Sequence, residues 1–192
     1  METLLALGAA LVLGLRHATD PDHLVAVSSL VVADEGDVRA AVRLGAWWGV
    51  GHAAILLVVG VPLIAFDEQL PAWFESGAET AVGLVIVLLA LRLVVHWRRP
   101  QPPLRTGRQA LAIGMLHGLA GTGAVVLLLV AAVPEPVEAA AALALFAPMS
   151  IVSMALCTSA FAWAFTRGAL YRTLLVPVLG ALGLAFGLWY VL

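Results

Sequence analysis

Long apolar runs alternate with short polar segments along the whole chain. Because a helix needs about 20 residues to cross the hydrocarbon core of a bilayer, each run is long enough to span it. The polar segments between the runs are rich in proline and charge, as loops are. The pattern predicts six transmembrane helices, at residues 3–32, 38–66, 77–97, 108–133, 137–166 and 170–192, with an acidic loop at 67–76.

The first run is too long for one straight crossing, and a proline lies in its middle. Pro21 removes a backbone N–H, frees the carbonyl of His17 and disfavours helix at Asp20. We therefore expect the first helix to be broken there. Gly121 and Gly123 in the fourth run suggest a second break.

Composition agrees with a membrane class. The 192 residues are 62% hydrophobic and 11% charged, and the mean hydropathy is +1.04. Soluble domains are about half apolar and about a quarter charged. The chain is therefore expected to be an all-α integral membrane protein, with residues 1–192 forming a single transmembrane domain. Its one cysteine, Cys157, excludes an internal disulfide.

The charges are segregated between the predicted loops. Every basic residue counted among Lys and Arg is arginine, and the loop arginines all follow the first, third or fifth predicted helix. The positive-inside rule places these loops in the cytoplasm and both termini outside, in a multi-pass protein of the cytoplasmic (inner) membrane. The loop arginines are Arg39, Arg43, Arg98, Arg99, Arg105, Arg108, Arg167 and Arg172.

The two halves of the chain resemble each other at an offset of about 100 residues. Residues 14–17 (GLRH) match residues 114–117 (GMLH), and residues 82–84 match residues 182–184. Three spans in each half would make the halves face opposite ways, which is the inverted-repeat plan of many secondary transporters. We therefore expect a 3+3 inverted repeat, with halves at residues 1–99 and 105–192.

The fifth run contains hydroxyl side chains among apolar residues. In a membrane interior, hydroxyl groups find partners on neighbouring helices. We expect interhelical hydrogen bonds from four residues: Ser150, Ser153, Thr158 and Ser159.

Four ionisable side chains lie within seven positions of the first run: His17, Asp20, Asp22 and His23. A charged side chain at the bilayer centre costs about 2.5 to 3.5 kcal/mol on insertion scales, so such a cluster is a functional-site hypothesis by default. Imidazole nitrogen and carboxylate oxygen are ligands of borderline divalent metals such as Ni²⁺, Co²⁺ and Zn²⁺. The alternative is a structural network in which Arg16 pairs with Asp20 or Asp22.

Two motifs resemble the nickel/cobalt transporter family. Residues 16–24 (RHATDPDHL) resemble the family signature RHAxDADHI, with proline for alanine at 21 and leucine for isoleucine at 24. Residues 48–55 (WGVGHAAI) are similar to its FxxGHSxV motif in the next helix. The resemblance implies that His17, Asp22, His23 and His52 bind metal.

The resemblance changes in the second half. The acidic third family motif, LGFDTATE, would fall near residues 118–126, which lack its aspartate and glutamate. Residues 114–123 look more like shorter six-helix relatives associated with urease and hydrogenase maturation. In these, His117 would take the place of the lost carboxylate, and maturation proteins for metalloenzymes become possible partners.

Together, these features predict a secondary transporter for a divalent transition metal, Ni²⁺ or Co²⁺, and not an enzyme. Asp20 and Arg16 would assist the ligands, no tightly bound cofactor or nucleic acid is expected, and the protein could form a homo-oligomer. One alternative is a proton or anion pathway without metal. The other alternative is an intramembrane metalloenzyme, but the sequence has neither an HExxH pair nor the repeated histidine clusters of such enzymes.

Overall fold

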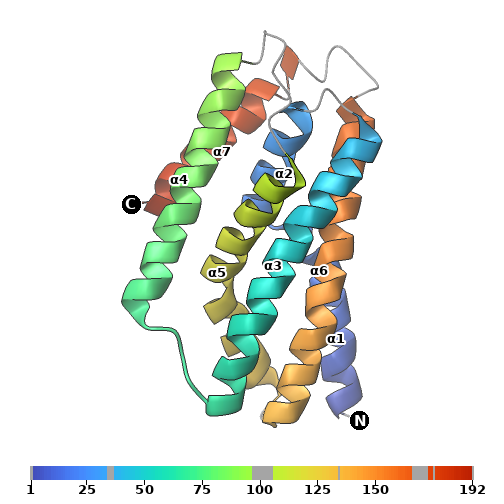
Figure 1. Ribbon diagram of the computed structural model, residues 1–192, viewed down its shortest axis with the longest axis vertical. Helices are drawn as coiled ribbons and strands as arrows, with labels where there is room; N and C mark the ends of the chain where they lie inside the picture. Colours follow the sequence, from blue (N-terminus) through green and yellow to red (C-terminus); the bar gives the residue numbers. More distant parts are fainter. Residues whose placement is uncertain are drawn as a thin grey trace.

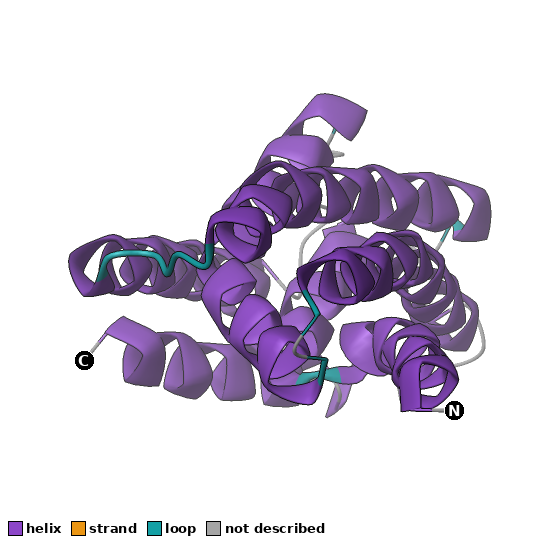
Figure 2. Cartoon of the chain, turned by 90° about the horizontal axis from the view of Figure 1, so that it is seen from below, coloured by secondary structure: helices purple, strands orange, loops and turns teal. Residues whose placement is uncertain are grey.

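Helices make up every regular element in the part of the chain that the computed structural model describes, namely residues 2–33, 37–96, 106–133, 135–165, 173–174 and 176–191 (Figures 1 and 2). The elements are α1 (Glu2–Arg16), the 3₁₀ turn η1 (His17–Thr19), α2 (Pro21–Ala33), α3 (Val38–Phe66), α4 (Ala72–His96), α5 (Gly107–Ala132), α6 (Pro136–Phe165) and α7 (Val176–Val191).

The long helices identify a multi-pass membrane protein. Among the described residues, α3, α4, α5 and α6 are long and apolar enough to cross a bilayer, while α1 and α7 are shorter apolar helices. Helices α1 and α2 follow each other along the long axis of the bundle and together occupy the first apolar run (Figure 1). The all-α class is confirmed, and the count of six crossings stays a prediction.

The predicted break in the first run is confirmed. Helix α1 ends at Arg16, the chain passes through η1, and Asp20 adopts an extended backbone with φ −65° and ψ 145°. Pro21 then occupies the first position of α2. A proline is well tolerated there, because the first N–H groups of a helix have no partner within the helix. The residues of the polar cluster thus lie where the helix is interrupted.

The second break, expected at Gly121 and Gly123, was a wrong prediction. Helix α5 runs without interruption from Gly107 to Ala132. Glycine lowers helix propensity by only about 1 kcal/mol and keeps its N–H, so it does not force a break as proline does.

One helix boundary differs from the prediction, and another lies outside the described residues. The acidic loop predicted at residues 67–76 ends early, because α4 begins at Ala72 and the Pro71 carbonyl accepts hydrogen bonds from the N–H groups of Phe74 and Glu75. Helix α7 is described from Val176, and the predicted start of the last helix at position 170 lies outside the described residues.

The segregation of charge holds in the described residues. Figure 1 places the starts of α3 and α5 at the end of the bundle opposite the N-terminus. Arg39 and Arg43 lie in the first turns of α3, and Arg108 lies in the first turn of α5. The acidic residues Asp67 and Glu135 flank α3 and α6 at the other end. Five arginines of the prediction lie outside the described residues: Arg98, Arg99, Arg105, Arg167 and Arg172.

Helix packing places the break of the first helix inside the bundle. Helix α3 packs against both α5 and α6, helices α1 and α2 pack against α6, and α4 packs against α7. Glycines permit the close approaches: a Cβ on Gly118 of α5 would lie 2.7 Å from the carbonyl oxygen of His52, and one on Gly14 of α1 would lie 2.6 Å from that of Phe146. Small residues allow such close packing in membrane proteins.

Candidate metal site

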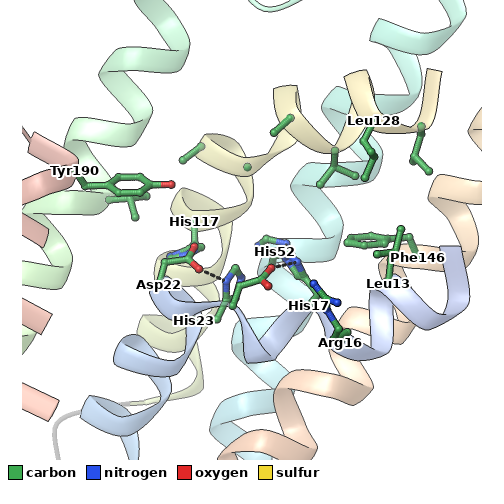
Figure 3. A pocket seen from close by; sticks show the side chains of 17 residues that line it. Leu13, Arg16, His17, Asp22, His23, His52, His117, Leu128, Phe146 and Tyr190 are labelled. Atoms are coloured by element: carbon green, nitrogen blue, oxygen red, sulfur yellow. Dashed lines mark hydrogen bonds and ion pairs between the residues drawn. The ribbon is translucent and has the colours of Figure 1, made fainter. Parts of the chain in front are cut away.

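Four histidines from four elements meet at the break. His17 lies on η1, His23 on α2, His52 on α3 and His117 on α5 (Figure 3). The ring centroid of His17 lies 4.3 Å from that of His23 and 4.8 Å from that of His52, and the His23 ring lies 4.4 Å from the His117 ring. His23, His52 and His117 are buried. Residues up to 100 positions apart in the chain therefore form one cluster.

Each histidine of the first motif has a carboxylate at its Nδ1 atom. The Nδ1 of His17 lies 3.3 Å from Oδ2 of Asp20, and the Nδ1 of His23 lies 3.0 Å from Oδ1 of Asp22. An ionised carboxylate only accepts hydrogen bonds, so a carboxylate at this position favours the tautomer with the proton on Nδ1. This arrangement leaves a lone pair on the Nε2 atoms of His17 and His23.

The Nε2 atoms face into the cluster. The Nε2 of His17 lies 2.9 Å from the Nε2 of His52, and the Nε2 of His23 is buried without a hydrogen-bond partner among the described residues. His17, His23 and His52 each offer one ligand atom, and these atoms lie within 4.8 Å of one another. Three imidazole nitrogens this close together could hold a divalent metal ion.

Asp22 also connects the cluster to the second half of the chain. The Nε2 of His117 donates a hydrogen bond of 2.7 Å to Oδ2 of Asp22, whose other oxygen accepts from His23. Asp22, His23 and His117 form a second group of three ligand atoms within 4.8 Å. His23 therefore belongs to both groups.

A cavity of about 260 Å³ lies against the cluster. Its polar wall contains Arg16 and the two aspartates as well as the four histidines, which includes every site residue predicted from the sequence. The remaining wall is largely apolar and comes from α1, α4, α5, α6 and α7, with Leu13, Leu128, Phe146 and Tyr190 among its residues (Figure 3).

Aromatic side chains that sequence reasoning did not select pack against the imidazoles. Trp48, which is fully buried, lies with its ring centroid 5.3 Å from that of His23 and 5.8 Å from that of His117. The ring centroid of Phe146, on α6, lies 5.1 Å from that of His17. These contacts restrict the orientation of the rings. Trp48 opens the second motif, but Phe146 and Tyr190 lie in apolar runs where no pattern marks them.

The hydroxyl groups of α6 differ from the prediction. Ser150, Thr158 and Ser159 donate to carbonyl oxygens of their own helix, at Ala147, Met154 and Leu156. Ser153 bonds to another element: it donates to the carbonyl oxygen of Leu15 and accepts from the N–H of Ala18, at 3.2 Å. The expected interhelical bond is thus confirmed for Ser153 and wrong for the other three, because a serine or threonine in a helix can reach the carbonyl one turn back.

Comparisons with known proteins identify two relatives. The chain is 26% identical over 210 residues to the urease accessory protein UreH of Bacillus sp. strain TB-90, an alignment that covers 99% of this chain and 92% of that protein. It is 34% identical over 114 residues to the high-affinity nickel transport protein of Cupriavidus necator, covering 48% of this chain and 32% of that protein.

No family model matches the chain, and no solved structure is significantly similar to it. The two relatives nevertheless carry the names that the motifs pointed to, a nickel transport protein and a urease accessory protein. The resemblance to the nickel/cobalt transporters, and to their shorter urease-associated relatives, is therefore confirmed.

Proposed function

We propose that this protein is a secondary transporter that moves a divalent transition-metal ion, Ni²⁺ or Co²⁺, across the cytoplasmic membrane. The observation that carries the proposal is the convergence of three imidazoles at the helix break, two of which have a carboxylate at Nδ1. An ion would bind the Nε2 atoms of His17, His23 and His52.

The chemistry of the ligands favours this class of ion. Imidazole suits borderline metals such as Ni²⁺, Co²⁺ and Zn²⁺, whereas Mg²⁺ and Ca²⁺ prefer oxygen ligands. Histidines that bind metal commonly donate their other N–H to a carboxylate, which fixes the tautomer and makes the free nitrogen a better ligand. His52 would bind after its proton moves to Nδ1, which has no partner among the described residues.

Asp22 and His117, which the sequence suggested as ligands, take supporting roles in this proposal, as does Asp20. Asp20 and Asp22 hold His17 and His23 in their metal-binding tautomers. His117 acts on the ion through Asp22, to which it donates a hydrogen bond. Outer groups of this kind change metal affinity about 10- to 100-fold when they are removed.

The relatives support transport more than catalysis. One is named a nickel transport protein and the other a urease accessory protein, and neither name describes an enzyme. We infer nickel as the favoured cargo. Proteins that mature nickel enzymes would receive the ion.

Helix packing supports the 3+3 inverted repeat. Exchanging the halves would map α3 onto α6, α4 onto α7 and the broken first helix onto α5. Under this exchange the contacts of α3 with α6 and of α4 with α7 map onto themselves, and the packing of α5 on α3 corresponds to that of α1 and α2 on α6. In such transporters the halves rock around a central site. With the arginine-rich end in the cytoplasm, both termini lie outside.

The test is metal binding and uptake by the purified protein. We expect titration calorimetry to detect Ni²⁺ or Co²⁺ binding, and proteoliposomes to take up the same ion. His17→Ala and His23→Ala should abolish both, because each removes one of three nitrogen ligands. His96→Ala, at the end of α4, is the matched control and should retain both.

Two results would contradict the proposal. Unchanged uptake by both histidine variants would overturn the assignment of the site. An absence of binding at micromolar metal would favour the proton or anion pathway.

A further inference from the structure

Ser153 of α6 bonds to the backbone on both sides of His17. Its hydroxyl group donates to the carbonyl oxygen of Leu15 and accepts from the N–H of Ala18. Ser153 is buried, with 3% of its surface exposed. These partners lie 135 or more positions away in the chain, so the bonds are part of the tertiary structure and not of α6 itself.

The same face of α6 also contacts the His17 ring. Phe146 precedes Ser153 by seven residues, or two helical turns, and its ring centroid lies 5.1 Å from that of His17. The backbone of α1 approaches α6 closely at Gly14, where a Cβ would lie 2.6 Å from the carbonyl oxygen of Phe146. Helix α6 thus restrains His17 through its backbone and through its ring.

Restraint matters most at this residue. His17 lies on a 3₁₀ turn between two helices, and such a turn has a poorer hydrogen-bond geometry than an α-helix. His52, by contrast, lies in the middle of the continuous helix α3. The Nε2 of His17 nevertheless lies 2.9 Å from that of His52. A partner outside the turn is therefore needed to keep the Nε2 atom of His17 at this distance from that of His52.

We propose that Ser153 is a positioning residue of the metal site: its hydroxyl group fixes the backbone around His17 so that the Nε2 atom of this histidine faces His52. The inference rests on the proposed function and adds a residue that neither the motifs nor the ligand set contains. Ser153 does not bind the ion. It acts through His17.

The experiment compares Ser153→Ala with Ser150→Ala. Ser150 is one turn earlier on α6 and equally buried, but its hydroxyl group donates to the Ala147 carbonyl of its own helix. We expect Ser153→Ala to weaken Co²⁺ binding about tenfold, which is the lower end of the effect of outer groups on metal affinity. Ser150→Ala should stay within about threefold of the wild type. In uptake assays the loss should raise KM with little change in the maximal rate.

The absorption spectrum of bound Co²⁺ provides a readout that a merely structural role would not change. The spectrum depends on the number and geometry of the ligands, so that of Ser153→Ala should differ from the wild-type spectrum in band position and intensity. The spectrum of Ser150→Ala should match the wild type. Ser153→Cys keeps nearly the same volume with a weak donor, and should give intermediate values for both affinity and spectrum if Ser153→Ala does not fold.

The outcomes separate this inference from the proposed function. If the wild type binds Co²⁺ and Ser153→Ala binds it with the affinity and spectrum of Ser150→Ala, the role of Ser153 is overturned while the transporter proposal stands. If the wild type itself binds no metal ion, both are overturned.

Discussion

The first helix of each half reaches the cluster in a different way. The first half contributes α1 and α2, which are separated by η1 and Asp20, and their break presents His17 and His23. The second half contributes α5, which is continuous and presents His117 in the middle of a regular helix. One helix is interrupted by a proline, whereas the other remains intact despite several glycines.

The comparison shows that proline and glycine, which both disfavour helix, have different effects in this bundle. Pro21 and the turn before it place two histidines six positions apart on one side of the cavity, which a straight helix would direct to different faces. The glycines of α5 instead bring its backbone close to α3: a Cβ on Gly114 would overlap the carbonyl oxygen of Trp48. In the proposed site the broken helix supplies two of the three nitrogen ligands, whereas the continuous helix α5 packs closely against α3.

The largest expected effect comes from filling the contact between α5 and α3. Gly114→Leu places a branched side chain against the backbone of Trp48, and we expect it to destabilise the folded protein by about 3 kcal/mol or to prevent its accumulation. Gly121→Ala is the control on the same helix, because a Cβ there meets nothing within 4 Å. It should be neutral or slightly stabilising. Thermal unfolding in detergent measures both, and equal effects would refute the assigned role of Gly114.

An intermediate effect is expected from the histidine on the continuous helix. His117→Ala removes the donor to Asp22 but none of the three proposed nitrogen ligands, so metal affinity should fall about tenfold. This corresponds to about 1.4 kcal/mol. His23→Ala should abolish binding under the same conditions. Titration calorimetry distinguishes the two, and a complete loss of binding in His117→Ala would make His117 a direct ligand.

The smallest expected effect comes from Pro21 itself. Pro21→Ala restores a backbone N–H at the start of α2, where it has no partner within the helix. The hydrogen bonds of η1 and those of Ser153 remain, so metal affinity should stay within about threefold of the wild type. A loss of binding as large as that of His17→Ala would show that the proline, and not this hydrogen bonding, holds the break.

Much of the architecture could be predicted from the sequence, because the hydrophobic runs report directly on membrane crossing. The second predicted span, at residues 38–66, coincides with α3, and the break at Pro21 lies where proline chemistry placed it. The break expected at Gly121 and Gly123 is absent because glycine keeps its N–H and costs a helix only about 1 kcal/mol. The glycines were visible in the sequence, but their presence alone does not tell a break from a continuous helix.

The site was predictable in its residues but not in its arrangement. Histidines and aspartates stand out against an apolar background, so His17, Asp20, Asp22, His23, His52 and His117 could all be named in advance. Which of these side chains bonds to which could not be predicted, because the pairing depends on how four elements pack together. Ser153 illustrates the limit: its sequence context is like that of Ser150, and only packing shows which of them reaches η1.

The hydrogen bond from His117 to Asp22 has a consequence for motion. It joins residues 95 positions apart, one in each half of the chain, directly beside the cluster. Any movement that separates α2 from α5 must break it, and a charge-assisted bond in low-dielectric surroundings is stronger than one in water. A conformation in which these two helices separate would therefore lack the bond. A change of 1.4 kcal/mol in the strength of the bond would alter the ratio of conformations with and without it about tenfold.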